Sequence, residues 1–202
     1  YPHDLAKAKE ILRGLGLEDR DGNGTVEDVK GTEAPFTVMT QRGVTNYERG
    51  AAFVRDELAK VGIGLEIAPL EFNTMIGRML QGDYDAMYYR PVLSSLDPAM
   101  TLDFWLSSGS ARFWNLMQKT PATEWERRID GLMADQSSTH DPARRRAIFN
   151  DVQRVFAENL PVLYFAAPRL YSAYSTRLTG TTPSVLRPPI LWNADTLAVA
   201  RD

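Results

Sequence analysis

Segments with helical periodicity alternate with segments of strand-like alternation along the first half of the chain. Apolar residues three and four positions apart predict helices near residues 1–16, 45–62 and 71–83. Alternating β-branched and aromatic residues predict strands at 35–41, 65–70 and 84–90. Thr45 and Glu48 fit a capping box for the second helix. Strands that alternate with helices favour crossover connections and a largely parallel sheet.

The second half of the chain is predicted to be helical before it ends in strands. An aromatic-rich stretch at 91–118 precedes two helices. Thr123 and Glu126 fit a capping box for the first helix. Asp141 followed by Pro142 is typical of an N-cap with proline at the first helical position. Segments 161–167 and 169–175 have the pattern of strands, and a proline-rich tail runs through 183–189. We therefore predict one α/β domain.

Composition excludes several classes of function. The chain has 202 residues, 44% of them hydrophobic and 24% charged, which is typical of a globular protein. A net charge of −3 provides no basic field for nucleic acid. Cysteine is absent, and neither His3 nor His140 lies in a metal-binding spacing. We predict no cofactor and no catalytic machinery.

The amino terminus indicates a piece of a longer protein. Residues 1–16 start an amphipathic helix with neither an initiating Met nor signal-peptide character. No apolar run approaches the roughly 20 residues that a membrane-spanning helix needs. We expect any targeting segment to lie in another part of the longer protein.

Residues 18–31, EDRDGNGTVEDVKG, begin like a calcium-binding loop. The candidate ligands alternate along the chain: Asp19, Asp21, Asn23 and Thr25. Glu27 falls at the ninth position, but the twelfth, which normally holds a bidentate Glu, is Lys30. Asp-Gly and Asn-Gly pairs are also turn formers. We predict a polar connector, and the alternative is a calcium-dependent interaction module built on residues 19–30.

Several phrases in a fixed order resemble one family. They are the opening YPHDLAKAKEIL, then LAKVGIGLEIAPLEF (58–72), MLQGDYDAMYY (79–89), SSLDPAMTLDFW (94–105) and FNDVQRVFAENLPVLYF (149–165). Together they resemble the extracellular solute-binding proteins of peptide/nickel-type ABC importers, and specifically the carboxy-terminal lobe of these proteins. The resemblance covers residues 1 to about 197.

The resemblance implies an α/β fold that is one lobe of a two-lobed, periplasmic-binding-protein-like molecule. Its mixed, mostly parallel sheet would be flanked by helices over residues 1–197, and residues 198–202 would lead back toward a missing amino-terminal lobe. The implied function is capture of a peptide or similar small polar solute and its delivery to the importer's membrane subunits. The implied location is periplasmic or extracellular, with a lipid anchor as one form of attachment.

In two-lobed α/β binders the ligand lies at the carboxyl ends of the strands. This placement selects residues 88–100, and aromatic residues of a later loop, 110–115, are added because exposed loop aromatics often mark recognition. The candidate ligand-binding residues are Tyr88, Tyr89, Arg90, Ser94, Ser95, Asp97, Phe113 and Trp114. The aromatic rings would stack, Arg90 would supply charge, and the serines would form hydrogen bonds. The structural alternatives are a helix cap for Asp97 and a satellite hydrophobic cluster for Phe113 and Trp114.

One position departs from the family's pattern. Members that clamp a free peptide amino group carry an Asp three positions before the Asp-Pro pair, where this chain has Ser94. A buried ammonium without a carboxylate partner is costly, which argues against a dipeptide held by that clamp. Nickel chelates, opines, sugars and longer peptides remain open. A second alternative is a hydrolase that uses Asp83 and Asp85, although no nucleophile or oxyanion motif accompanies them.

Overall fold

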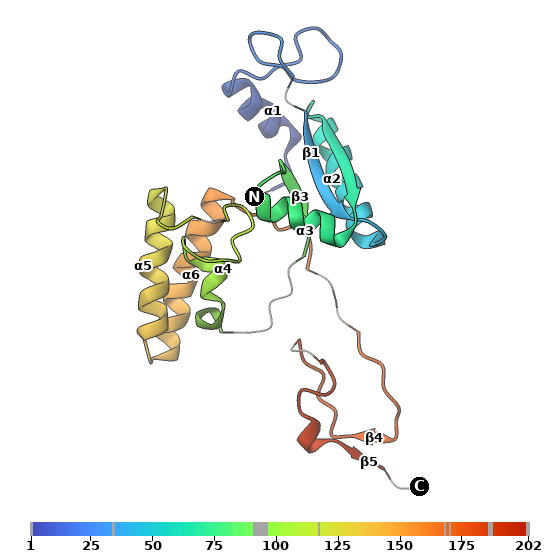
Figure 1. Cartoon of the computed structure of the whole chain (residues 1–202), viewed down its shortest axis with the longest axis vertical. Coiled ribbons are helices and arrows are strands. Elements are labelled where there is room, and N and C mark those ends of the chain that lie inside the picture. Colours follow the sequence, from blue (N-terminus) through green and yellow to red (C-terminus); the bar gives the residue numbers. More distant parts are fainter. Residues whose placement is uncertain are drawn as a thin grey trace. The chain divides into compact units, whose positions relative to one another are not determined.

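The computed structural model describes residues 2–33, 35–90, 97–116, 118–167, 169, 171–185 and 188–200. The chain divides into two compact units, Tyr1–Pro91 and Val92–Asp202 (Figure 1). The single lobe over residues 1–197, with a tail at 198–202, stays a prediction.

The first unit is a three-stranded sheet with helices. Its elements are α1 (Leu5–Gly14), β1 (Phe36–Gln41), α2 (Thr45–Ala59), β2 (Leu65–Leu70), α3 (Phe72–Gln81) and β3 (Ala86–Tyr88). The strands are parallel in the order β2-β1-β3. The predicted alternation of helices and strands and the parallel sheet are confirmed, although β3 is shorter than the predicted 84–90. Each crossover helix returns the chain so that the next strand can run parallel to the last.

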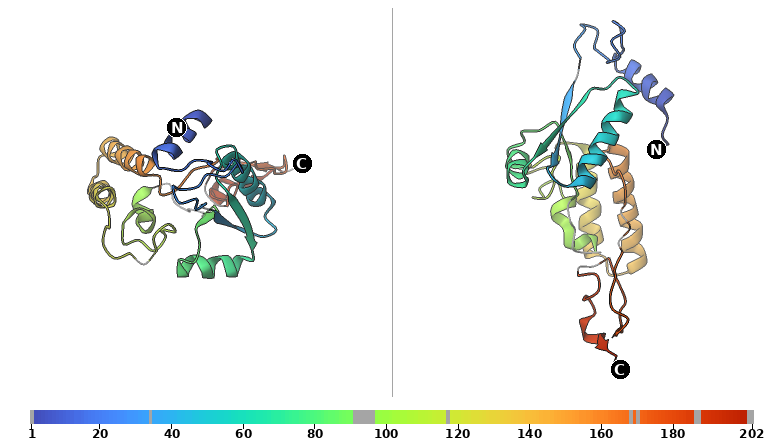
Figure 2. Two further views of the ribbon diagram at one scale, coloured as in Figure 1. Left: turned by 90° about the horizontal axis from the view of Figure 1, so that it is seen from above. Right: turned by 90° about the vertical axis from the view of Figure 1, so that its right-hand side faces the viewer.

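The two faces of this sheet are covered by different helices (Figure 2). Helix α2 packs on the face where Val38, Ala51 and Leu65 form a buried core cluster. Side chains alternate between the faces of a strand, so Met39, one residue after Val38, points to the other face. Helix α3 contacts β1 and buries Met75 and Met79. The first unit therefore has three layers.

The predicted capping box of α2 is wrong. Val44 is the N-cap residue and has no side-chain cap, because Thr45 is already the first helical residue. Glu48 still serves the helix start, since its Oε1 accepts a hydrogen bond of 2.9 Å from the Gly43 N–H. The carboxylate thus satisfies a backbone donor two residues before the predicted N-cap, Thr45.

The second unit is built on a helix pair. Its described elements are a 3₁₀ turn (Pro98–Thr101), α4 (Leu102–Trp105), α5 (Glu124–Ser138), α6 (Pro142–Asn159), β4 (Leu178–Thr179), a 3₁₀ turn (Ala194–Thr196) and β5 (Ala198–Val199). Both predicted helix starts are confirmed: Thr123 and Glu126 form a capping box, and Asp141 accepts from the Arg144 N–H. Helices α5 and α6 pack together over a core of Phe104, Ile129, Met133, Val152, Val155 and Phe156.

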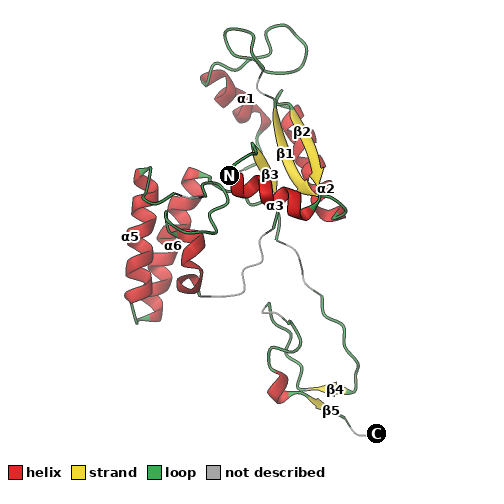
Figure 3. Cartoon of the chain, in the orientation of Figure 1, coloured by secondary structure: helices red, strands yellow, loops and turns green. Residues whose placement is uncertain are grey.

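The predicted strands at 161–167 and 169–175 are wrong. The described residues of these segments are outside any strand, and Figure 3 draws them as loop. Leu163 and Tyr171 are 77% and 86% exposed. A strand needs a neighbouring strand to pair with, and within the described residues neither segment belongs to a sheet. The two strands of the second unit, β4 and β5, instead form a short antiparallel pair.

Candidate functional site

Three tyrosine rings meet at the carboxyl ends of β1 and β3. Tyr88 ends β3, Tyr89 follows it, and Tyr47 lies in the first turn of α2. The Tyr47 ring centroid is 6.4 Å from that of Tyr88 and 6.0 Å from that of Tyr89, both edge-on. The sequence predicted Tyr88 and Tyr89 as site residues, and Tyr47 was not among the candidates. We call these three residues the tyrosine cluster.

Tyr88 is held in place by the α2 helix and by β1. A Cβ atom at Gly50 would lie 2.3 Å from the Tyr88 Oη, so only glycine leaves room for the phenol. The Thr40 hydroxyl donates to the Tyr88 carbonyl at 3.3 Å. Burial, and then the neighbouring Tyr47, raise the pKa of Tyr88 above its ordinary value. Tyr88 thus fixes the position of the cluster, and all three tyrosines are half-buried.

Charged side chains flank the tyrosine cluster at the same edge of the sheet. Arg42 follows β1, donates to the Pro69 carbonyl at 3.0 Å and pairs with Glu71 at 3.7 Å. Arg90 is exposed after β3. Aromatic faces beside guanidinium groups suit a ligand that has both apolar and polar or anionic parts. The carboxyl edge therefore offers chemistry for recognition.

Asp97 has a structural role in the second unit. Its side chain accepts from the Ala99 N–H at 3.0 Å, and Arg145 Nη2 donates to its two oxygens at 2.7 and 3.0 Å. The Ala99 hydrogen bond and then Arg145 lower the pKa of Asp97. These contacts support the helix-cap interpretation. Ser94 and Ser95 lie outside the described residues.

Trp114 packs in the core of the second unit. Its ring centroid lies 5.2 Å from that of Phe104 and 5.4 Å from that of Phe156. The Arg112 guanidinium lies 5.1 Å from the same ring. Phe113 is half-buried. The ring contacts support the hydrophobic-cluster interpretation of Trp114, and contact of Phe113 or Trp114 with a ligand stays a prediction.

A buried ion pair lies beside Trp114 and was not predicted. Arg112 Nη2 donates to Glu126 Oε1 at 2.6 Å, and the side chains are 1% and 4% exposed. Burial alone would raise the pKa of Glu126, but hydrogen bonds from Arg112, from Gln118 and from two backbone N–H groups lower it to about 2. The pair joins the loop before α5 to the start of that helix. No local pattern indicates a buried arginine.

The two acidic residues of the hydrolase alternative lie at the amino ends of the strands. A recess of about 350 Å³ is lined there by Thr37, Met39, Arg78, Gly82, Asp83, Tyr84 and Asp85. Asp83 pairs with Arg78 Nε at 2.8 Å, and Asp85 Oδ2 accepts from the Thr37 N–H at 2.9 Å. Both carboxylates thus stabilise the fold at the edge opposite the tyrosine cluster.

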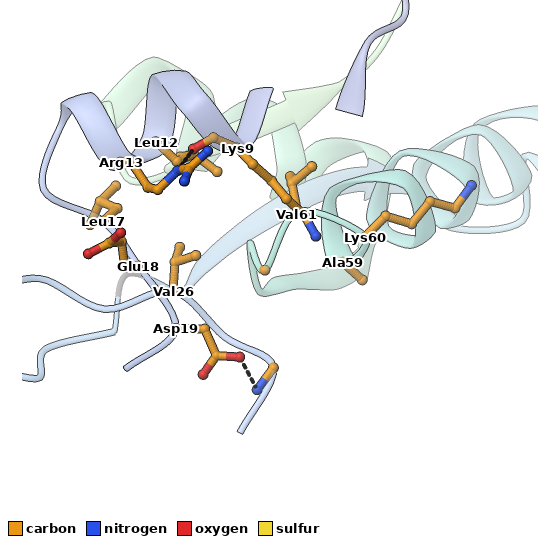
Figure 4. Close-up of a pocket in the computed structure, with 12 residues that line it drawn as sticks. Lys9, Leu12, Arg13, Leu17, Glu18, Asp19, Val26, Ala59, Lys60 and Val61 are labelled. Carbon is orange, nitrogen blue, oxygen red and sulfur yellow. Dashed lines mark hydrogen bonds between the residues drawn. The ribbon is translucent and has the colours of Figure 1, made fainter. Parts of the chain in front are cut away.

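A larger recess, about 560 Å³, lies between α1, the connector and the end of α2 (Figure 4). Leu12, Leu17 and Val26 contribute apolar surface, while Lys9 and Glu18 contribute charge. In this recess the Asp19 Oδ2 accepts from the Gly24 N–H at 3.0 Å. The connector, residues 18–33, therefore forms a folded turn region, in agreement with the polar connector predicted at 18–31.

Comparison with known proteins identifies relatives. The protein-family model described as "Bacterial extracellular solute-binding proteins, family 5 Middle" matches residues 1–113. The chain is 24% identical over 183 residues to Di/tripeptide-binding protein 2 of Pseudomonas aeruginosa (strain UCBPP-PA14), covering 89% of this chain and 31% of that protein. The chain thus spans about a third of the length of the curated relatives it matches.

Solved structures show the same fold. Oligopeptide-binding protein AppA from Bacillus subtilis, in complex with a nonapeptide, matches with a TM-score of 0.66 and 23% identity, covering 100% of this chain and 40% of that one. The periplasmic binding protein MelB from Agrobacterium fabrum C58, in complex with stachyose, matches with a TM-score of 0.69 and 23% identity, covering 80% and 25%. The predicted α/β, periplasmic-binding-protein-like fold is confirmed. Among the described residues, no helix is long and apolar enough to cross a membrane.

Proposed function

Because the chain belongs to the bacterial extracellular solute-binding proteins of family 5, we propose that it supplies a ligand-binding lobe of an ABC importer's substrate-binding component. The proposed ligand is a peptide or a similar small polar solute, captured in the periplasm or outside the cell. Delivery to the importer's membrane subunits would follow capture.

The observation that carries this proposal is the tyrosine cluster at the carboxyl edge of a parallel sheet. Tyr47, Tyr88 and Tyr89 lie where α/β binding proteins hold their ligands. Arg90 and Arg42 flank the rings and can pair with carboxylates. A peptide offers such a site both carboxylate and amide groups together with apolar side chains.

Two lobes are part of the proposal. The cluster forms one wall of a site, and a ligand pocket normally buries most of the ligand surface. The relatives are about three times as long as this chain. A second, amino-terminal lobe would supply the opposing wall, and closure of the two lobes on the ligand is the state that membrane subunits would recognise.

Relatives support a binding role and leave the ligand class open. One relative is named a di/tripeptide-binding protein, AppA was solved with a nonapeptide, and MelB was solved with stachyose. We propose peptide first, because the edge combines guanidinium groups with aromatic rings. Ser94 stands where an amino-clamping Asp is found in the family, so the proposed anchor is the carboxylate end of the ligand.

The test uses the longer protein that contains this chain. Its melting temperature is measured with a mixture of peptides two to about nine residues long, and with a mixture of oligosaccharides; ligands that co-purify are identified by native mass spectrometry. Binding of a peptide should raise the melting temperature by linkage. Tyr89→Ala should weaken peptide affinity about tenfold, the typical worth of one well-packed aromatic contact.

Tyr84→Ala is the matched control, because Tyr84 lies just before β3 and Tyr89 just after it. This variant should keep the wild-type peptide affinity at a temperature where both variants are folded. Equal losses in the two variants would place the ligand away from the carboxyl edge. A shift with oligosaccharides alone would replace peptide by sugar, and turnover of any ligand would contradict the binding role.

A further inference from the structure

The connector between α1 and β1 brings three carboxylates together. One oxygen from each of Asp19, Asp21 and Glu27 lies within 4.8 Å of the other two. Asp19 and Asp21 are exposed, whereas Glu27 is only 5% exposed. Like charges at this separation repel each other, most strongly where one of them is buried. The arrangement becomes favourable when a cation lies between the oxygens.

Glu27 carries the strongest indication of a ligand. Its Oε1 accepts a hydrogen bond of 2.6 Å from the Arg20 N–H. Its Oε2 is shielded from solvent and has no hydrogen-bond partner among the described residues. Burying a carboxylate oxygen without a donor is costly, and such atoms in native proteins are explained by a water or an ion. A bound metal ion would satisfy Oε2.

The basic side chains of the connector are used elsewhere. Residues 18–33 carry six carboxylates and two basic side chains. The Arg20 guanidinium donates to the backbone carbonyls of Gly16, Glu27 and Asp28, and forms an ion pair with Glu18 at 3.6 Å. Lys30 forms no ion pair within the part of the chain that the structure describes. Among the described residues, no ion pair joins a basic side chain to Asp19, Asp21 or Glu27.

Backbone geometry fixes the carboxylates in place. The Asp19 oxygens accept from the Gly22 and Gly24 N–H groups at 2.8 and 3.0 Å, the second of which is drawn in Figure 4. Asp21 Oδ1 accepts from the Asn23 N–H at 3.0 Å. These bonds orient both aspartates before any ion binds, which lowers the entropic cost of binding.

An antiparallel bridge brings Glu27 to the aspartates. The backbone N–H groups and carbonyls of Glu18 and Glu27 exchange hydrogen bonds of 3.1 and 3.0 Å. The chain has reversed direction after Gly24, so Glu27 lies beside Asp19. The inner carboxylate is thus Glu27, and the charge of Lys30, three residues later, does not occupy a ligand position.

We propose that Asp19, Asp21 and Glu27 hold a calcium ion. Calcium takes six to eight oxygen ligands in flexible geometry, and carboxylates, backbone carbonyls and water all serve. The bound ion would tie the connector to the rest of the first unit, because the neighbouring Val26 N–H already donates to the carbonyl of Gly62, three residues after α2, at 2.8 Å. The site is separate from the tyrosine cluster, and its role is independent of the proposed transport function.

Calorimetry on the chain, first stripped with a chelator, tests the proposal with CaCl₂ as the probe. We expect saturable binding of one ion with a Kd below about 1 mM, the weak end of calcium sites in extracellular modules. Glu27→Gln removes the buried charge and keeps the side-chain volume, and it should weaken binding at least about tenfold. Asp21→Asn, at an exposed position, should weaken it similarly.

Asp28→Asn is the matched control. It removes the same charge from the same connector, but the Asp28 carboxylate accepts from the Lys30 and Thr32 N–H groups at 2.8 and 2.9 Å, away from the cluster. Its calcium affinity should stay within about twofold of wild type. Should Glu27→Gln fail to fold, Asp21→Asn decides the result.

Three outcomes overturn the proposal. The first is no binding heat at about 10 mM CaCl₂, a concentration above the whole range of such sites. The second is an equal loss in Asp28→Asn and Asp21→Asn, which would indicate diffuse attraction to an acidic loop. The third is tighter binding of MgCl₂ than of CaCl₂, which would assign the site to the smaller ion.

Discussion

Replacing Glu126 by Gln should destabilise the second unit strongly. The substitution keeps the shape of the side chain but removes its charge. Arg112, which is 1% exposed, would then keep only neutral acceptors, namely the Ser107 carbonyl at 2.7 Å and the Gln118 Oε1 at 3.2 Å. A buried charge that loses its partner is far more costly than the same charge paired.

The pKa shift of Glu126 and the typical cost of breaking a buried ion pair give a similar loss in the free energy of unfolding. The pKa of Glu126 falls from 4.5 to about 2 in the folded chain, and a shift of that size corresponds to about 3 kcal/mol of stability at neutral pH. Breaking one partner of a buried ion pair typically costs about 3–5 kcal/mol. Glu126 Oε2 also accepts from the Ala122 and Thr123 N–H groups, at 2.7 and 2.9 Å, and an amide nitrogen turned toward them would repel these donors.

Urea unfolding, monitored by tryptophan fluorescence, measures this loss of stability in the second unit. All four tryptophans lie in Val92–Asp202, so the signal reports the second unit. With a urea dependence of about 1.5 kcal/mol per molar, a loss of 3 kcal/mol moves the midpoint down by about 2 M. The shift should persist in added salt, because a buried pair is little screened.

Glu124→Gln is the control, since Glu124 begins the same helix and pairs with Arg127 while its side chain is 83% exposed. Glu124→Gln should lower the free energy of unfolding by less than about 0.5 kcal/mol. The double variant Arg112→Met/Glu126→Gln should be less destabilised than the sum of the two single variants. A Glu126→Gln midpoint no lower than that of Glu124→Gln would refute the reasoning.

Three further predictions follow from single contacts. The second unit should lose stability as the pH falls from about 4.5 toward about 2, because folding lowers the pKa of Glu126 and protonation removes the stabilisation that is present above the unfolded pKa. Acid unfolding is monitored by tryptophan fluorescence, and the free energy of unfolding should depend less steeply on pH in Glu126→Gln. An unchanged pH dependence would contradict the assignment to Glu126. Gly50→Ala places a Cβ 2.3 Å from the Tyr88 Oη and should lower the free energy of unfolding by about 1–3 kcal/mol through overpacking. Unfolding is measured by circular dichroism, with Gly77→Ala, whose Cβ meets open space, as the control. Gly109→Ala places a Cβ 2.1 Å from the Asp103 carbonyl oxygen and should lower the free energy of unfolding by at least about 1 kcal/mol. The control Gly131→Ala, inside α5 with open space around it, should be neutral or stabilising. Equal melting temperatures of the two variants would refute the clash.

Elements whose signals are local were predictable from the sequence. The Thr123 and Glu126 box and the Asp141-Pro142 start each lie within one helical turn, and both helices begin there. The β1–α2–β2 order followed from the change in hydrophobic period. Thr45 failed as a cap because the helix start is set by backbone geometry at Val44, which side-chain type alone does not determine.

The candidate site was predictable only in part. Residue order along β3 placed Tyr88 and Tyr89 at the end of a strand. Tyr47 was missed because its helical spacing also fits a core position, and its contact with the other two rings spans about 40 residues of sequence. Arg112 was missed for a similar reason, since its partner Glu126 looked fully used as a capping residue.

The predicted strands at 161–167 and 169–175 were wrong because a periodic pattern belongs to one strand, whereas pairing needs two. Leu163 and Tyr171 have the alternation of a strand, yet the described chain pairs neither of them. In the connector, counting positions along the chain puts Lys30 where a calcium loop needs its acid. Pairing across the chain instead puts Glu27 beside Asp19. A ligand set depends on the paired backbone, so the calcium site that we propose uses residues brought together by pairing, and the position count at Lys30 does not test it.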